Sequence, residues 1–225
     1  MQQLLQDALA INCYYGGEDL FITMTANPAW PEVQSALVHG QAAHNHPDLV
    51  VRAFRAKLQS LIKEISEGVL SAVNAYLYTI EFQKCGLPHA HIIVFLKPHA
   101  ELHFPGNIDT LISSEFPEGE ANADLLELVK KYMVHKPCGA RDPNALCMVK
   151  GRCSKGFPKQ FREETSVTED SYACTRCHNT GQSHQVSGKP IDNRWVVCHS
   201  RYLIWRYHCH INVESIASVK TIKYI

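Results

Sequence analysis

Two histidines separated by one alanine, His89 and His91, have a spacing that could bind a metal ion. They open an apolar run with the composition of a strand, and alternate side chains of a strand project from one face about 6–7 Å apart. The preceding run, residues 75–83, places Glu81 and Gln83 on one face in the same way. If the two runs form a hairpin with Gln83 near His89, Glu81 lies near His91. This donor set suits Mg²⁺ or Mn²⁺ with open coordination positions, and the alternative is a solvent-facing histidine pair.

A second group of metal-binding side chains lies in a segment with few core-forming residues. His135, Cys138, Cys147 and Cys153 offer one imidazole and three thiolates, which could close a tetrahedral structural zinc site. The spacing is looser than that of a paired Cys-x-x-Cys ribbon, so reduced packing cysteines are the alternative.

Two further motifs could bind metal. Cys174 and Cys177, with His178 directly after them, could join the earlier cysteines, although we interpret them as packing residues. His208-Cys-His210 is another His-x-His pattern, and we treat His210 as a residue of the sheet or an alternative third ligand.

A basic cluster with interleaved aromatic residues follows the second group of cysteines. Cations can neutralise phosphates while aromatic rings stack on unpaired bases, so the cluster suits single-stranded DNA. The alternative is a solvated loop balanced by Glu163 and Glu164. The residues that we assign to DNA binding are Lys150, Arg152, Lys155, Phe157 and Lys159, with Phe161 and Arg162 adjacent.

The elements that would position these groups follow from periodicity and turn signals. Apolar residues at helical spacing predict helices over residues 1–11, 47–66 and 122–135, and a helix start from Glu214 onwards. Strand-like composition predicts strands over residues 19–25, 75–83, 89–96, 194–199 and 202–213. Residues 98–120 have the composition of a loop, and residues 135–189 show little periodicity.

Composition limits the class of protein. The chain has 225 residues, 45% of them hydrophobic, and its 22 basic and 22 acidic residues cancel, so DNA binding would need local patches. An odd count of nine cysteines and the absence of a signal-like start favour a reducing, intracellular compartment. No apolar run approaches about 18 residues, so we expect no membrane partner.

We therefore expect an α+β fold with a mainly antiparallel sheet. Helices should pack on its apolar face, opposite the metal face. The expected organisation is a first core region at 1–134, a Cys-containing basic insertion and zinc module at 135–189, and a return of the core at 190–225.

Four collinear motifs are similar to a known family. The segment YTIEFQKCGLPHAHIIVFL at residues 78–96 resembles the core signature of the Helitron helicase-like N-terminal domain, the Rep nuclease region of rolling-circle Helitron transposases. Residues 21–32 (FITMTANPAWPE), 147–159 (CMVKGRCSKGFPK) and 209–214 (CHINVE) extend the resemblance over nearly the whole chain.

The resemblance implies an endonuclease of the His-hydrophobic-His class that nicks single-stranded DNA at transposon ends. It implies that His89 and His91 hold the metal, with Gln83 as third ligand and Glu81 as the alternative. It also implies a tyrosine nucleophile that forms a 5′-phosphotyrosine link. The match of residues 218–225 to the start of the family's tyrosine helix makes Tyr224 that nucleophile.

The family's second tyrosine would fall at position 228, and its helicase domain would follow. We therefore expect a truncated piece of a nuclear, Helitron-like protein. The alternatives are a catalytically inactive remnant that binds single-stranded DNA, and a structural zinc protein in which the His89 and His91 pair is incidental.

Overall fold

A computed structural model describes residues 2–15, 17–83, 86–97, 105–167 and 173–215. The helices are α1 (Gln2–Tyr15), α2 (Pro31–Gln34), α3 (Pro47–Ser66), α4 (Pro105–Leu111), α5 (Ala123–Tyr132) and α6 (Arg201–Tyr207). The longer strands are β1 (Leu20–Thr25), β2 (Val73–Phe82), β3 (Pro88–Leu96) and β10 (Ile211–Ser215). Short 3-10 helices span Ala43–Asn45, Glu120–Asn122 and Asn193–Trp195.

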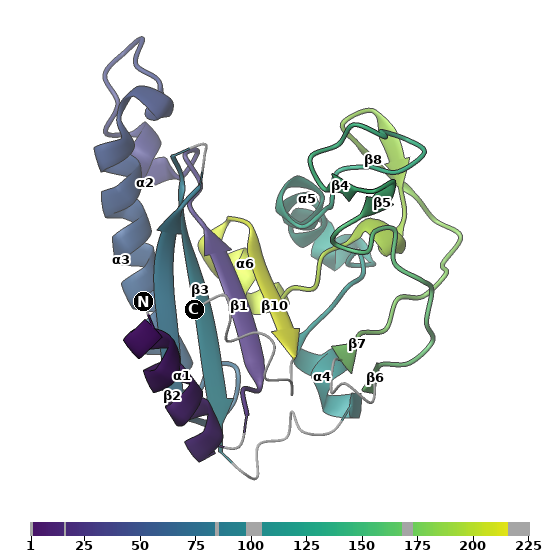
Figure 1. The fold of residues 1–225 in the computed structure, drawn as a ribbon. Coiled ribbons are helices and arrows are strands. Elements are labelled where there is room, and N and C mark those ends of the chain that lie inside the picture. The colour runs from purple at the N-terminus through teal and green to yellow at the C-terminus, as the bar shows by residue number, and fades with distance from the viewer. Residues whose placement is uncertain (1, 16, 84–85, 98–104, 168–172, 216–225) are drawn as a thin grey trace.

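The main sheet has four antiparallel strands in the order β10-β1-β3-β2. The hairpin of β2 and β3 turns through Gly86, whose φ of 81° is a backbone conformation that glycine adopts without steric cost. β1 lies between β3 and β10, so it pairs with two strands that are more than a hundred residues apart in the sequence (Figure 1). The predicted α+β class with an antiparallel sheet is confirmed.

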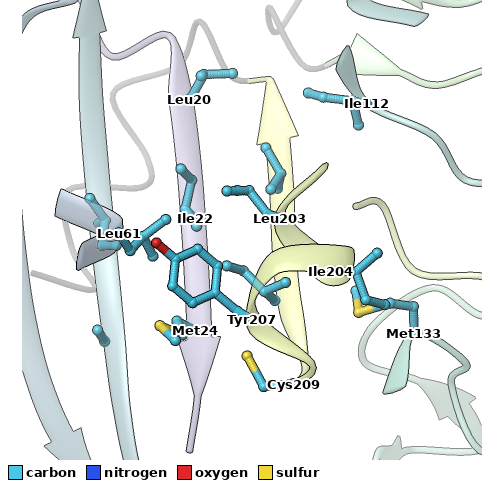
Figure 2. Packing of buried hydrophobic residues seen from close by; sticks show 14 of the residues in the cluster. Leu20, Ile22, Met24, Leu61, Ile112, Met133, Leu203, Ile204, Tyr207 and Cys209 are labelled. Atoms are coloured by element: carbon cyan, nitrogen blue, oxygen red, sulfur yellow. The ribbon is translucent and has the colours of Figure 1, made fainter. Parts of the chain in front are cut away.

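The apolar face of the sheet carries the main core. Ile22 and Met24 of β1 and Ile92 of β3 are completely buried. α3 covers them because its apolar residues recur every three or four positions, and its Leu61 is fully buried. Figure 2 shows that Tyr207 of α6 also packs into this core, beside Met24.

α1 packs on the opposite face of the sheet, the one that carries His89 and His91. Ile93 and Phe95 of β3 form a small separate core there, with Leu9 and Ile11 of α1 packed against it. This helix therefore covers the later half of β3 and leaves the face around the two histidines to other groups. Helices thus lie on both faces of the sheet, whereas we predicted them on the apolar face.

The predicted strand over residues 202–213 is wrong. Residues 201–207 form helix α6, and the strand β10 begins only at Ile211. Leu203, Ile204 and Tyr207 are buried at positions one and four apart, which is helical spacing, although aromatic and β-branched residues give this segment a strand-like composition. His208 ends the helix in a left-handed conformation, with φ of 47°.

Three other predictions of elements need correction or restriction. Residues 194–199 form no continuous strand: a 3-10 turn is followed by isolated bridges between Val134 and Val196 and between Ser113 and His199. The predicted loop at 98–120 contains helix α4. Glu214 belongs to β10, and the rest of the predicted terminal helix, residues 216–225, lies outside the described residues.

The insertion is built of three two-stranded hairpins rather than longer elements. They are β4 (Met148–Val149) with β5 (Arg152–Cys153), β6 (Ser166–Val167) with β7 (Ala173–Cys174), and β8 (His184–Val186) with β9 (Lys189–Ile191). Cys138 belongs to the same buried cluster as the sheet core, and Cys147 and Phe157 pack against this cluster, so the insertion packs directly on the sheet domain. Among the described residues, no helix has the length and apolar character needed to cross a membrane.

Candidate metal centre and nucleic-acid interface

The two histidines of β3 are held by two threonines of the neighbouring strand β1. Thr25 Oγ1 lies 3.0 Å from His89 Nδ1, and Thr23 Oγ1 lies 3.2 Å from His91 Nδ1. These contacts follow from the antiparallel register, in which Thr25 is opposite His89 and Thr23 is opposite His91. Both threonines share a face because they alternate along β1. The sequence reasoning missed them, although the Thr-x-Thr alternation at 23–25 was the signal.

The contacts made by Nδ1 determine what Nε2 can do. A ring nitrogen binds a cation only when it is unprotonated, so Nε2 is the ligand when the proton sits on Nδ1 and is donated to the threonine oxygen. The Nε2 atom of His89 is buried and has no hydrogen-bond partner in the described protein. Burial, together with the nearby His91 and His210, lowers the pKa of His89 to about 4. His89 is therefore neutral at pH 7, which is the form that coordinates a metal.

Glu81 and Gln83 reach the two histidines at different atoms. Glu81 Oε1 lies 3.1 Å from His91 Nε2, on the ring edge opposite the threonine. Gln83 Nε2 lies 3.3 Å from His89 Nδ1, the nitrogen that also contacts Thr25. The side-chain contacts are the predicted ones, with Glu81 near His91 and Gln83 near His89. The backbone register differs from the predicted one, because Glu81 lies opposite His89 and Thr79 lies opposite His91, so Glu81 reaches His91 diagonally across the hairpin. Of the two residues, Glu81 is the one that contacts an Nε2 atom, the ring nitrogen on the side away from the threonines.

His210, the alternative third ligand, lines the same cavity from the segment before β10. Its Nδ1 atom lies 2.8 Å from the carbonyl oxygen of Tyr132 and donates to it, which leaves Nε2 unprotonated in the neutral ring. Burial lowers the pKa of His210, so the ring stays neutral. The face therefore carries three imidazoles and one carboxylate, a donor set that fits a divalent cation. Among the described residues, the group of ligand atoms that converges within 4.8 Å is the cysteine cluster described below.

The polar face opens into a cavity of about 680 Å³. One wall is the sheet, which contributes His89, His91 and Glu81. The insertion supplies the other wall with Lys155 and Lys159. The structure thus brings two cations of the basic cluster to the histidines, and this juxtaposition could not be read from their separation of more than sixty residues in the sequence.

The remaining members of the basic cluster are placed differently. Lys150 and Arg152 are exposed on the hairpin of β4 and β5 and do not line the cavity. Phe157 lines it, but His135 stacks on its ring with a centroid distance of 4.3 Å and Lys159 Nζ lies 4.8 Å from the ring centroid. Phe157 therefore supports Lys159 and His135 with its ring faces. Of the two adjacent residues, Phe161 packs against Arg194, whose guanidinium carbon lies 4.7 Å from the ring centroid.

The four residues predicted to hold zinc converge. The ligand atoms of His135, Cys138, Cys147 and Cys153 all lie within 4.8 Å of one another. His135 Nε2 lies 3.6 Å from Cys138 Sγ and 3.5 Å from Cys153 Sγ. Zinc with tetrahedral angles, about 2.3 Å from sulfur and about 2.0–2.1 Å from nitrogen, requires a sulfur–nitrogen separation of about 3.6 Å. The spacing of the atoms therefore fits a tetrahedral Cys₃His zinc site.

Local backbone structure explains how widely spaced residues meet in this cluster. Cys147 and Cys153 flank the hairpin of β4 and β5, which turns through Lys150 and Gly151, both with positive φ. Burial raises the pKa of the Cys138 thiol. For Cys153, burial acts in the same direction but hydrogen bonds from backbone amides outweigh it, so its pKa is lowered. Amides that donate to sulfur favour the thiolate, the form that binds metal.

The second cysteine motif stays apart from this cluster. Cys177 is buried and pairs through its backbone with Arg162. His178 lies against Glu115, with Nδ1 3.2 Å from a carboxylate oxygen. These contacts agree with the interpretation of this motif as packing residues. Tyr224, the predicted nucleophile, lies outside the described residues.

Comparison with known families points to one family. Residues 1–94 match the model of the Helitron helicase-like domain at the N-terminus, which confirms the predicted resemblance over this part of the chain. The matched segment contains β1, β2 and the two histidines of β3. The cysteine cluster and β10 lie beyond it. No curated protein matches the chain.

Proposed function

We propose that this protein is a metal-dependent single-strand DNA endonuclease region of a Helitron-like rolling-circle transposase. The observation that carries the proposal is the shared cavity, in which two imidazoles and a carboxylate face two lysines. A nuclease needs both sets of groups, because the first can hold a cation at a phosphate and the second can hold the DNA backbone. The match of residues 1–94 to the Helitron domain supports the same assignment.

His89, His91 and Glu81 are the residues that would hold the catalytic cation. Nitrogen and oxygen ligands of this kind accept Mg²⁺ or Mn²⁺, which supplies Lewis acidity to the phosphate that is cleaved. Glu81 has more geometric support than Gln83 as third ligand, because its oxygen lies 3.1 Å from His91 Nε2. Thr23 and Thr25 would act as positioning residues that hold the Nδ1 side of each ring.

The lysines on the opposite wall would bind the DNA strand. Lys155 and Lys159 can each contact a phosphate next to the cleaved one, which fixes the strand across the histidine face. Lys159 is kept in place by the ring of Phe157 and by its hydrogen bond to the carbonyl of Lys155, 3.1 Å away. The strand therefore meets cations whose position is set before it binds, which reduces the entropy cost of binding.

The nucleophile in this proposal is Tyr224, assigned by family resemblance. Its phenolate oxygen forms a bond to phosphorus as the bond from phosphorus to the 3′ oxygen breaks. The products are a 5′-phosphotyrosine link and a 3′-hydroxyl, after the 3′ oxygen takes up a proton. The substrate would be single-stranded DNA at transposon ends, which places the activity in the nucleus.

We also infer that a structural Zn²⁺ binds His135, Cys138, Cys147 and Cys153. The observation behind this inference is the pair of sulfur–nitrogen distances of 3.5 and 3.6 Å, which tetrahedral coordination requires. Zinc would be a structural staple for an insertion whose strands are only two or three residues long.

The nuclease proposal is tested with labelled single-stranded oligonucleotides and Mn²⁺. The full chain should form a covalent protein–DNA adduct that survives a denaturing gel. The variants His89→Ala and Tyr224→Phe should form none. Matched controls on exposed residues, His39→Ala and Tyr14→Phe, should leave the adduct unchanged.

Three outcomes would contradict the proposal or part of it. An adduct that persists in Tyr224→Phe would exclude this tyrosine as nucleophile. An adduct that persists in His89→Ala would exclude the histidine site. Metal-independent DNA binding with no adduct in the wild-type chain would replace the nuclease with a single-stranded-DNA-binding module.

A further inference from the structure

β2 is an edge strand whose pairing with β3 is regular from Ala75 onwards, after a register shift between Val73 and Ala75 at its start. It follows β3 at the end of the strand order, so one side of its ten residues has no neighbouring strand. Exposed edges are normally blocked by lysine, proline or a bulge, because their free N–H and C=O groups can pair with another chain. The sequence of β2, VNAYLYTIEF, contains no lysine or proline. Its one charged residue, Glu81, points to the histidine face, where it contacts His91.

The other face of this edge strand shows a row of large apolar side chains. Tyr76, Tyr78, Ile80 and Phe82 alternate along β2 and are between 37% and 62% exposed. On the neighbouring strand β3, Ala90, Ile92 and Val94 of the same face are completely buried. Helix α3 therefore covers the centre of the sheet and stops short of the edge row. Contiguous exposed apolar surface of this kind commonly marks an interaction site.

Between the row and α3 lies a groove of about 660 Å³, beside the outermost strand in Figure 1. Its helical wall has an aliphatic part, which includes Val51 and Ile62, and a cationic part formed by Arg55 and Lys63. No acidic residue lines it among the described residues. Arg55 has no ion-pair partner within the described part of the chain, and Lys63 has only an exposed contact of 3.8 Å with Glu67. The groove is thus apolar at its floor and positive at its rim.

We propose that this groove binds an extended, acidic segment of a partner protein, which adds to the sheet as a fifth strand beside β2. Backbone groups of the segment would pair with the free edge, and every second side chain would enter the groove between α3 and the row from Tyr76 to Phe82. Acidic residues in the segment would meet Arg55 and Lys63. This inference goes beyond the proposed nuclease function, since it concerns the face of the sheet opposite the histidines.

Two other occupants fit the groove less well. A nucleic-acid strand could stack on the tyrosines, but it offers no backbone amides to complete the edge and would leave the aliphatic floor against sugar and phosphate. A second copy of the chain could pair edge to edge, but it would bring its own Arg55 and Lys63 to the same groove. Like charges would then face each other, which opposes association.

The test uses a fluorescein-labelled probe peptide that alternates glutamate with valine and phenylalanine. The full chain should bind it more tightly than the same peptide with lysine in place of glutamate, as measured by fluorescence anisotropy. Ile80→Lys should weaken binding by about tenfold or more, because the new charge lies on the floor of the groove. In hydrogen–deuterium exchange, the acidic probe should slow exchange of amides in β2.

Charge reversal provides the sharper control. Arg55→Glu combined with Lys63→Glu should reverse the preference, so that the lysine peptide binds more tightly than the glutamate peptide. Arg52→Glu lies on the same helix but outside the groove and should leave the preference unchanged. Circular dichroism and Mn²⁺ binding would show that each variant is folded.

Four results would overturn the inference. The first is that the acidic probe does not bind at concentrations up to about 1 mM, and the second is that both peptides bind equally well. The third is that the chain binds oligothymidine and Ile80→Lys does not. The fourth is that the wild-type chain is a dimer and Ile80→Lys is a monomer. The third would assign the groove to nucleic acid, and the fourth would assign it to a second copy. None of them bears on the adduct assay, so the two proposals fail separately.

Discussion

Neutralising the two lysines of the cavity should weaken binding of single-stranded DNA and reduce its salt dependence. Lys155 and Lys159 line the cavity that contains the histidines. Each phosphate contact on a single strand contributes about 0.7 to the slope of log affinity against log salt concentration. The double variant Lys155→Gln/Lys159→Gln should therefore lower the magnitude of this slope by about 1.4. If the two contacts contribute nothing at about 1 M salt, the affinity at about 0.1 M salt falls by about 25-fold.

The assay is fluorescence anisotropy with a labelled oligothymidine of about twelve nucleotides, titrated at several salt concentrations. The matched control is Lys150→Gln/Arg152→Gln, which removes the same charge from the same segment at residues that do not line the cavity. This control should keep the wild-type slope. Lys159→Arg should also keep it, because the charge is retained.

Two results would refute this reasoning. An equal loss of slope in both double variants would show that the DNA follows the exposed basic surface instead of the cavity. An unchanged slope in Lys155→Gln/Lys159→Gln would show that neither lysine contacts phosphate, and the assignment of this cavity to DNA would fail.

Three further predictions concern metal and stability. Glu81→Ala should weaken Mn²⁺ binding, measured by titration calorimetry, more than Gln83→Ala does. The reason is that, of the two residues, Glu81 is the one that contacts an Nε2 atom. If Gln83→Ala weakened binding more, Gln83 would be the third ligand. Cys147→Ser should abolish binding of one Zn²⁺ per chain and lower the free energy of unfolding by several kcal/mol. The control Cys13→Ser, at an exposed cysteine, should change neither. Zinc that stays bound to Cys147→Ser would contradict the proposed zinc site. His199 is fully buried, and burial lowers its pKa from 6.5 to about 4, so the folded state loses stability as pH falls through this window. Between about pH 7.5 and about pH 5 this loss amounts to about 2 kcal/mol. The difference in free energy of unfolding between wild type and His199→Asn, measured with urea, should become smaller by that amount. A difference that does not depend on pH would refute the prediction.

The histidine site was predictable because strand periodicity is a local property. Alternation places His89 and His91 on one face whatever surrounds them, and the antiparallel pairing of β2 with β3 brings Glu81 and Gln83 to that face. The confirmed helix α3 follows from local periodicity in the same way. The Thr-x-Thr alternation indicates that Thr23 and Thr25 share a face, but nothing in the sequence states that β1 lies beside β3. Thr23 and Thr25 were therefore missed.

The error at residues 202–213 has a physical cause as well. Tyrosine, isoleucine and tryptophan favour strands by composition, but intrinsic preferences are small compared with the burial of large side chains. In this segment, Leu203, Ile204 and Tyr207 all reach the sheet core only when the backbone is helical. Tertiary packing thus overrode the local preference. The exposed row on β2 is the opposite case, because its apolar alternation correctly predicted a strand but indicated a buried face.

The cysteine cluster and the cavity on the histidine face are linked through the ring of Phe157. His135 belongs to the cluster, and its imidazole stacks on Phe157 at a centroid distance of 4.3 Å with an angle of 9° between the rings. The ring of Phe157 also contacts the ammonium of Lys159, which lines the cavity. A metal that fixes His135 therefore also fixes the ring on which Lys159 rests. If zinc binds as we propose, the cluster would therefore help to position Lys159, a cation that faces the histidines, together with the hydrogen bond from Lys159 Nζ to the carbonyl oxygen of Lys155.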